Sequence, residues 1–315
     1  MKNTMPYHNC KGAIVMTRVK RNKGLYEISL LKLVPYVFVP VILYLLVVVF
    51  PIINAGYYSL HNTMNWQHIF AGFYNYRKLV TDSIFWLALR NNFFFMFVSI
   101  IFQLGTALLV CVCFVQKKVI GPKFVRGVFF FPSIISSIVI SYIWKILYNN
   151  QFGLVNGFFT AVGFSFMRQD WLANPHIVLV SIGIPLAWQF IGFYLVILLA
   201  GVTNIDPEIF DVAMMDGATG MRLFLFIVLP LLRNTINVSL IICISGSIKI
   251  FDVVYGMTLG GPGYASTVLA QYAYSVSFEQ ANYGYGATVS IAMLIISTVL
   301  VTWFNSLSRS RSNAE

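Results

Sequence analysis

The stretch IDPEIFDVAMMDGATGMRLFLFIVLP, residues 205–230, is a polar interruption in an otherwise apolar sequence. Asp206 suits a helix N-cap, Pro207 suits the first helical position, and Glu208 complements the positive end of a helix. Gly217 can end this helix in a left-handed conformation, and a second amphipathic run follows it. The stretch therefore predicts a helical hairpin at residues 206–230.

This predicted hairpin is unusually acidic for the chain, because it holds four of the ten Asp and Glu residues. Its first helix also has an apolar face at helical spacing. Either the hairpin is a solvated loop that happens to be helical, or it is a surface that docks against a partner protein. The acidic residues are Asp206, Glu208, Asp211 and Asp216, and the apolar face comprises Ile209, Phe210, Ala213 and Met214.

The composition outside the hairpin is that of a membrane protein. Of the 315 residues, 58% are hydrophobic and only 10% are charged, whereas soluble domains are about 25% charged. The mean hydropathy is +0.78. The net charge of +11 does not indicate nucleic-acid binding, because the Lys and Arg residues cluster beside apolar segments. We expect an all-α, polytopic membrane protein that contacts lipid and binds no nucleic acid.

Six apolar segments are long enough to cross a bilayer as helices, and six crossings put both termini on one side. The flanks on that side hold 15 Lys and Arg, and the opposite flanks hold 3. The positive excess places both termini and the hairpin in the cytoplasm. We expect cytoplasmic tails at 1–32 and 306–315, and a six-helix transmembrane domain at 33–305 with the hairpin between its fourth and fifth helices. The expected spans are 33–57, 91–115, 128–147, 176–202, 236–257 and 285–304.

No motif for catalysis or nucleotide binding is found in the sequence. It has no GxxxxGK[ST] phosphate loop, no HExxH and no GxSxG, and its four Cys and four His are not spaced for a metal site. We expect no enzyme activity and no cofactor bound by this chain. If the protein drives active transport, the energy must come from another subunit.

Two ionisable residues inside the expected fifth span are candidates for a transport path. Lys249 and Asp252 are three positions apart, so on one helix they share a face and can pair, and Ser245 extends that face. A lysine at the bilayer centre costs about 2.5–3.5 kcal/mol, which favours a position facing the bundle or water. Either the two residues form an internal ion pair that fixes helix packing, or they line the path. Further candidates for a polar and aromatic cavity are Trp188, Gln189, Phe193 and Ser247.

The spacing within the hairpin resembles the EAA motif of permease subunits in binding-protein-dependent ABC importers. The match runs from Asp211-Val212-Ala213 through Gly217 to the IVLP segment at 227–230. Asp stands here for the motif's Glu, and Val for its first Ala. Later segments are similar to the carbohydrate-uptake branch of the family, namely FDVVY at 251–255, TLGGP at 258–262, YAY at 272–274 and YGYGA at 283–287.

The resemblance implies the type I ABC importer permease fold in a bacterial cytoplasmic membrane. It implies a pore formed with a second, homologous permease subunit, an ABC ATPase dimer that binds ATP and Mg, and an external sugar-binding protein. In this family the EAA motif is the coupling helix that enters a cleft on the ATPase. An unpaired Lys249 would favour an anionic sugar or sugar acid as the substrate. The residues that the motif assigns to ATPase coupling are Glu208, Asp211, Val212, Ala213, Asp216, Gly217, Ile227 and Pro230.

Two other functions are possible on the residues alone. A self-sufficient secondary transporter would need an ion or proton relay, which only Lys249 and Asp252 could supply. A membrane-embedded enzyme would need a catalytic constellation that the sequence does not contain. The secondary transporter also leaves the acidic hairpin unexplained, so we expect the permease function.

Overall fold

The computed structural model describes residues 30–62, 69–116 and 118–312, with side chains from residue 36 to residue 308. The predicted tail at 1–32 lies outside these residues except for its last three positions, which begin the first helix. The chain divides into two compact units, residues 1–52 and 53–315. In the first unit the described part comprises α1 (Leu30–Tyr44), η1 (Leu45–Val49) and the first turn of α2 (Phe50–Ser59), and most of its apolar side chains from residue 36 onward are exposed.

The described chain is mostly helical, as the sequence predicts, and its five long apolar helices are sufficient to cross a membrane. These helices are Tyr36–Ser59, Ser83–Val115, Val178–Thr203, Arg233–Thr258 and Tyr283–Ser308. A sixth crossing is present if the bent pair α6 and α7 counts as one span. Beside the helices, one short antiparallel ladder pairs β1 (His61–Asn62) with β2 (Ile69–Phe70).

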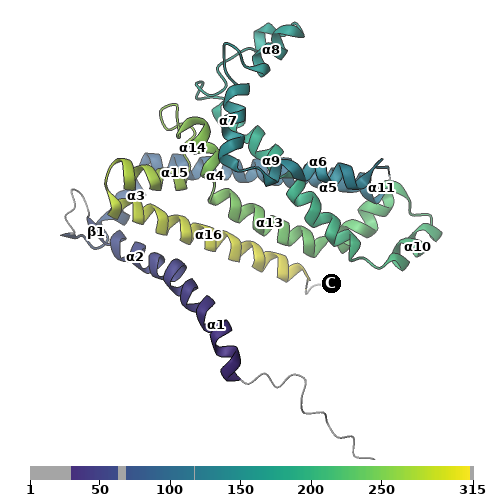
Figure 1. Cartoon of the computed structure of the whole chain (residues 1–315), viewed down its shortest axis with the longest axis horizontal. Coiled ribbons are helices and arrows are strands. Elements are labelled where there is room, and N and C mark those ends of the chain that lie inside the picture. Colours follow the sequence, from purple (N-terminus) through teal and green to yellow (C-terminus); the bar gives the residue numbers. More distant parts are fainter. Residues whose placement is uncertain (1–29, 63–68, 117, 313–315) are drawn as a thin grey trace, which may run out of the picture. The chain divides into compact units, whose positions relative to one another are not determined.

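The second unit is a helical bundle with a small helical segment at each end (Figure 1). The end that carries α10 is opposite the end that carries α14 and α15. The elements up to the third crossing are α3 (Tyr74–Thr81), α4 (Ser83–Val98), η3 (Ser99–Gly105), α5 (Thr106–Val115), α6 (Pro122–Ile134) and α7 (Ser137–Leu147). They are followed by α8 (Leu154–Ala161), η4 (Ser165–Met167), α9 (Val178–Thr203), α10 (Pro207–Met215), α11 (Gly220–Leu223), η5 (Phe224–Val228) and α12 (Leu229–Leu231). The last elements are α13 (Arg233–Ile248), α14 (Asp252–Thr258), α15 (Leu269–Tyr274), η6 (Ser275–Glu279) and α16 (Tyr283–Ser312).

The expected span at 128–147 is not one straight helix, because the chain turns by 94° between α6 and α7. Pro132 lies inside α6 and cannot donate a backbone hydrogen bond, and the helix ends two residues later at Ile134. Ile135 and Ser136 are both extended, with ψ of 137° and 134°. As a result α7 projects away from the bundle axis (Figure 1). The first half of this crossing packs on α9, where Gly192 lies so close to the backbone of Phe129 that no side chain would fit.

The expected loop at 258–283 is also more ordered than predicted. It contains α15 and η6, whose side chains Leu269, Tyr272 and Val276 join a buried cluster with α3, α4 and α16. Asn91 on α4 donates to the carbonyl oxygens of Ala265 (2.9 Å) and Thr267 (2.8 Å). This loop therefore folds back onto the bundle instead of extending into water.

Candidate functional site

A cavity of about 320 Å³ opens in the bundle where α13 ends and α14 begins. This volume lies at the lower end of the range of ligand pockets, about 300–1,000 Å³. Phenylalanine rings and polar side chains share the lining. The cavity is lined by Ser99, Gln103, Ser137, Leu186, Phe190, Phe193, Tyr194, Ile242, Cys243, Gly246, Ser247, Lys249, Ile250, Phe251, Asp252 and Val253.

The two candidate ionisable residues lie at a break between helices, so the expectation that they share one continuous helix face is wrong. Helix α13 ends at Ile248, Lys249 and Phe251 leave the helical path, and α14 restarts at Asp252. Both charged side chains are exposed and both line the cavity. Within the described part of the chain, no ion pair joins Lys249 to Asp252. The cavity therefore presents one cation and one carboxylate separately.

A buried amide from a distant helix holds this break in place. Asn92 on α4 is fully buried, and its Nδ2 donates to the carbonyl oxygens of Ser247 (2.8 Å) and Ile248 (3.1 Å). Its Oδ1 accepts from the backbone nitrogen of Leu269 (2.9 Å), just where α15 begins. Helix ends leave carbonyl and amide groups without intrahelical partners. Asn92 satisfies such groups at two helix ends at once.

Another buried amide holds the break between α6 and α7. Gln189 on α9 is 1% exposed, and its Nε2 donates to the carbonyl oxygen of Ile135 (3.1 Å) and to Oγ of Ser137 (3.1 Å). Gln103 on η3 likewise donates to the carbonyl oxygen of Leu186 (3.0 Å). A buried polar group without a partner is costly. Asn92 and Gln189 thus supply the hydrogen-bond donors for the carbonyl oxygens at the two helix breaks, α13–α14 and α6–α7.

The end of the bundle that carries α15 is tied together by Asp82. Its carboxylate caps α4 by accepting from the backbone nitrogen of Ile84 (2.8 Å), and it also accepts from the hydroxyls of Tyr272 (2.6 Å) and Tyr285. Burial alone would raise the pKa of Asp82, but the hydrogen bonds from both tyrosines and from the backbone hold that pKa below its usual value of 3.8. One carboxylate thus joins α4, α15 and α16.

We expect Asp82→Asn to lower the free energy of unfolding of the purified complex by about 2–3 kcal/mol at pH 7, because charge-assisted bonds and a cap are weakened. A lowered folded-state pKa means that the carboxylate stabilises the fold at every pH above the unfolded value. That stabilisation disappears as the pH falls through the folded pKa, so the difference between variant and wild type should shrink at acidic pH. Unfolding curves between pH 8 and pH 3 measure this.

The matched control for Asp82 is Asp170→Asn, an exposed carboxylate in the segment between η4 and α9. It should change the free energy of unfolding by less than about 0.5 kcal/mol. A penalty at Asp82 that is equal to the control's, or that does not change with pH, would contradict the assigned role.

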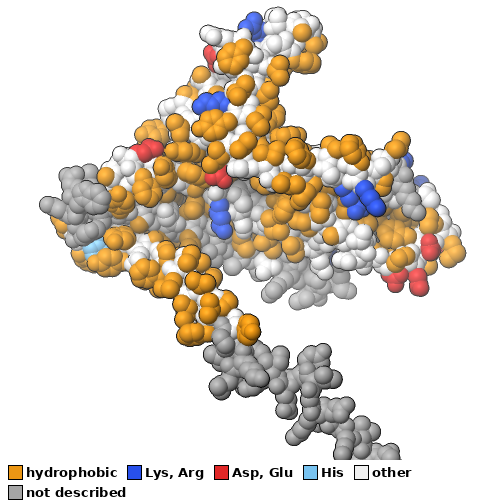
Figure 2. Space-filling model, in the orientation of Figure 1, with side chains coloured by type: hydrophobic (Ala, Val, Ile, Leu, Met, Phe, Trp, Pro, Cys, Tyr) orange, Lys and Arg blue, Asp and Glu red, His pale blue; other side chains and the backbone are white. Residues whose placement is uncertain are grey.

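In the segment 206–230, the first helix begins and ends where the sequence predicts. Asp206 caps α10, its Oδ1 accepting from the backbone nitrogen of Glu208 (3.0 Å), and Pro207 is the first helical residue. Gly217 follows the helix with φ of +78°, a conformation that favours glycine. Acidic side chains gather over α10 at this end of the bundle (Figure 2). The second half is helical from Gly220 to Leu231, through α11, η5 and α12.

The predicted coupling residues divide into a surface and an anchor. Six of them are exposed. Five of these lie on α10 or directly after it, and the sixth is Pro230 in α12. Ala213 is 4% exposed, and Ile227 packs against the same buried cluster as Ala213. The predicted apolar face is only half right, because Phe210 packs inward with Ala213 whereas Ile209 and Met214 are exposed. The five exposed coupling candidates on and after α10 are Glu208, Asp211, Val212, Asp216 and Gly217.

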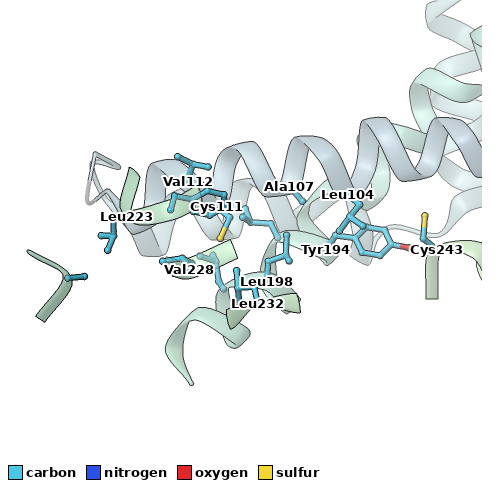
Figure 3. Close-up of a cluster of buried hydrophobic side chains, with 14 residues drawn as sticks. Leu104, Ala107, Cys111, Val112, Tyr194, Leu198, Leu223, Val228, Leu232 and Cys243 are labelled. Atoms are coloured by element: carbon cyan, nitrogen blue, oxygen red, sulfur yellow. The ribbon is translucent and has the colours of Figure 1, made fainter. Parts of the chain in front are cut away.

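The anchor connects this surface to the bundle through one continuous hydrophobic cluster. Leu223 and Val228 of the hairpin pack with Cys111 of α5 and Leu198 of α9 (Figure 3). At its other end the same cluster contains Tyr194 and Cys243, which also line the cavity. Protein interiors are close-packed and transmit displacement instead of absorbing it. One buried cluster thus extends from beneath the acidic surface to the cavity.

Among the cavity candidates from the sequence, Phe193, Ser247, Lys249 and Asp252 line the cavity. The other three lie elsewhere. Gln189 is occupied by the break between α6 and α7, and Ser245 is half-buried outside the cavity lining. Trp188 lines a separate, apolar groove of about 480 Å³ between α4 and α9. Asn91, Asn92 and Asp82 have structural roles that were not predicted, although amides inside an apolar run are a signal for the first two.

Comparison with known proteins identifies the family. A probable ABC transporter permease from Pyrococcus horikoshii is 32% identical over 234 residues, which cover 74% of this chain and 79% of the relative. The chain belongs to the permease proteins of ABC transporters. No family model matches this permease. With its apolar helices it is a multi-pass membrane protein.

Other relatives of this permease carry names that include a substrate. It is 29% identical to the lactose transport system permease LacF of Rhizobium radiobacter, covering 80% of this chain and 85% of LacF. It is 28% identical to the trehalose/maltose transport system permease MalF of Thermococcus litoralis, covering 82% and 87%. A solved bacterial ABC transporter that imports the acidic polysaccharide alginate has the same fold, with a TM-score of 0.77 at 21% identity, covering 88% of this chain and 95% of that chain.

Proposed function

We propose that this permease is one of two homologous pore-forming subunits of an ATP-driven importer that moves a carbohydrate across a bacterial cytoplasmic membrane. The observation that carries the proposal is the cavity, which places Lys249 and Asp252 beside the rings of Phe190, Phe193 and Phe251. Sugar hydroxyls both donate and accept hydrogen bonds, and the C–H faces of a pyranose pack on aromatic rings. The names of the lactose and the trehalose/maltose relatives support the same substrate class.

We further propose that the chain crosses the membrane six times, with α6 and α7 together as the third crossing and with both termini in the cytoplasm. The excess of Lys and Arg in the flanks on that side supports this orientation. In this orientation the end with α10 faces the cytoplasm, and the end with α14 and α15 faces the external sugar-binding protein.

The exposed face of α10 is proposed to be the contact with the ABC ATPase dimer, which binds ATP and Mg, while the permease itself is non-catalytic and holds no cofactor. Closure of the ATPases displaces α10, and the buried cluster transmits that displacement towards the cavity. Coupling also requires the reverse effect. The sugar-loaded binding protein must favour the same bundle state that favours closed ATPases, because linkage between binding sites is reciprocal.

The test is purification of the tagged permease followed by reconstitution into liposomes. We expect it to copurify with an ATPase and a second permease subunit, and the complex to take up radiolabelled lactose, trehalose or maltotriose only with ATP and the external binding protein. Uptake by the purified chain alone would overturn the proposal, because it would indicate a self-sufficient secondary transporter. Absence of uptake of any sugar by the complete complex would overturn the substrate class.

We expect Lys249→Gln to change selectivity more than overall activity. Lys249 is exposed to the cavity and does not pair with Asp252, so its charge is available to a carboxylate on the substrate. Uptake of a uronic acid disaccharide relative to a neutral disaccharide should fall by about 10-fold, as expected for the loss of one charge-assisted bond. Competition of the two sugars in the same liposomes measures the ratio, with Lys145→Gln on α7 as the exposed control. An unchanged ratio would contradict this role of Lys249.

A further inference from the structure

A row of five aromatic rings runs from the cavity towards the end of the bundle that carries α15. The ring centroids of Phe251 and Tyr255 are 5.0 Å apart and stacked, and those of Tyr255 and Tyr274 are 5.5 Å apart, edge to face. Tyr274 lies 5.1 Å from Phe278, which lies 6.0 Å from Tyr283. Each ring therefore contacts the next without a gap.

Helical spacing and one helix contact produce this row. Phe251 and Tyr255 are four positions apart at the start of α14, and Tyr274 and Phe278 are four positions apart across α15 and η6. Residues four apart lie on one face of a helix. The contact of Tyr274 with both Phe251 (5.6 Å) and Tyr255 joins the two pairs into one surface.

The row connects the cavity to an exposed ring, as a path for a ligand requires. Phe251 lines the cavity. Phe278, the fourth ring, is 65% exposed, and Tyr255, Tyr274 and Tyr283 are half-buried. In Figure 1 the helices α14 and α15, which carry Tyr255 and Tyr274, lie opposite α10. The row thus begins at the proposed external face and ends inside the bundle.

The row is distinct from the hydrophobic packing that stabilises the fold. None of its five rings belongs to the three buried clusters found among the described residues. By contrast, the stacked rings of Tyr148 and Trp171 are part of a buried cluster, and they hold the segment around α8 onto the bundle. Rings that contact each other and remain open to one side are available to a ligand.

Polar groups accompany the row along its length. The exposed carboxylate of Asp252 lies next to Phe251 in the chain, and Glu279, exposed and accepting from Oγ of Ser275 (2.5 Å), lies next to Phe278. A pyranose ring presents C–H groups on its faces and hydroxyls around its edge. A surface of ring faces flanked by carboxylates matches both parts.

We propose that Phe251, Tyr255, Tyr274, Phe278 and Tyr283 form an aromatic track on which successive sugar rings of a di- or oligosaccharide slide from the external face into the cavity. This inference rests on the proposed import of carbohydrate. The track acts on the transfer of sugar into the bundle, so it is independent of the ATPase contact at α10.

The test compares Phe278→Leu with Phe278→Trp in the reconstituted complex, supplied with its binding protein and radiolabelled maltotriose. Leu keeps an apolar side chain but removes the ring, whereas Trp keeps a ring face. We expect Phe278→Leu to transport about 3- to 10-fold less sugar per ATP, the size of one lost ring contact, with stimulation of the ATPase unchanged. Phe278→Trp should keep at least half of wild-type transport, and the loss in Phe278→Leu should be smaller with trehalose, which has fewer rings.

The matched control is Phe158→Leu on α8, a ring with 63% exposure that lies outside the row and should transport normally. Wild-type transport by Phe278→Leu, or equal losses in Phe278→Leu and Phe278→Trp, would overturn the track while leaving carbohydrate import intact. If the wild-type complex moves no sugar, the proposed function fails first and the track fails with it.

Discussion

Replacement of Asp211 by lysine should abolish the stimulation of ATP hydrolysis by the sugar-loaded binding protein, and uptake should fall by at least about 10-fold. Asp211 is exposed on α10 and belongs to none of the buried clusters among the described residues, so the reversed charge acts on the partner surface and not on the fold. The amount of complex in the membrane should therefore stay at the wild-type level. ATPase rates and uptake in proteoliposomes measure the two effects separately.

Gly217→Pro tests the same surface through the backbone. Gly217 has φ of +78°, whereas proline is restricted to about −65°. The turn after α10 must then change its direction, and α10 is displaced while the buried anchor remains. We expect intact insertion and loss of coupling, as for Asp211→Lys.

Asp170→Lys provides the control for these two variants, because Asp170 is an exposed aspartate outside the hairpin. It should retain stimulated ATP hydrolysis and uptake. Normal stimulation in Asp211→Lys and Gly217→Pro would mean that α10 is a solvated segment with no role in coupling.

Replacement of Asn92 by leucine should have the largest effect on stability. The two side chains have similar volumes, but leucine leaves the carbonyl oxygens of Ser247 and Ile248 and the backbone nitrogen of Leu269 without their partner. At about 1–3 kcal/mol for each buried unsatisfied group, the free energy of unfolding should fall by about 3 kcal/mol or more. The melting temperature of the purified complex should fall by about 6 °C or more.

Asn234→Leu is the matched control, since Asn234 lies exposed on the same helix, α13, whose other end Asn92 caps. That variant should stay within about 0.5 kcal/mol of wild type. Equal melting temperatures for the two variants would show that the break between α13 and α14 does not depend on Asn92.

The apolar helices and the charged segments between them could be predicted from the sequence, because each depends on residues that are close together in the chain. The N-cap at Asp206, the proline after it and the positive φ at Gly217 are local features, and the structure confirms all three. The long apolar helices follow from composition in the same way. Phe193, Ser247, Lys249 and Asp252 were found by residue type, and the structure places them around one cavity.

The helix breaks could not be predicted, because each depends on a side chain far away in the sequence. From their spacing, Lys249 and Asp252 were predicted to lie on one helix face. In the structure α13 ends before them, because Asn92, more than 150 positions earlier, donates hydrogen bonds to its last carbonyl oxygens. Gln189 was predicted to line the cavity, but its amide donates to the carbonyl oxygen of Ile135 at the break between α6 and α7.

The sequence by itself determined that this is an apolar, multi-pass helical protein with an acidic, capped helical hairpin. Tertiary structure alone decided where the chain breaks between α6 and α7 and between α13 and α14, which candidates meet at the cavity, and that five separate aromatic residues form one row. The physical reason is that caps, turns and hydropathy are satisfied by near neighbours in the chain. A carbonyl left free at a helix break is satisfied only by whichever donor the packed bundle brings to it.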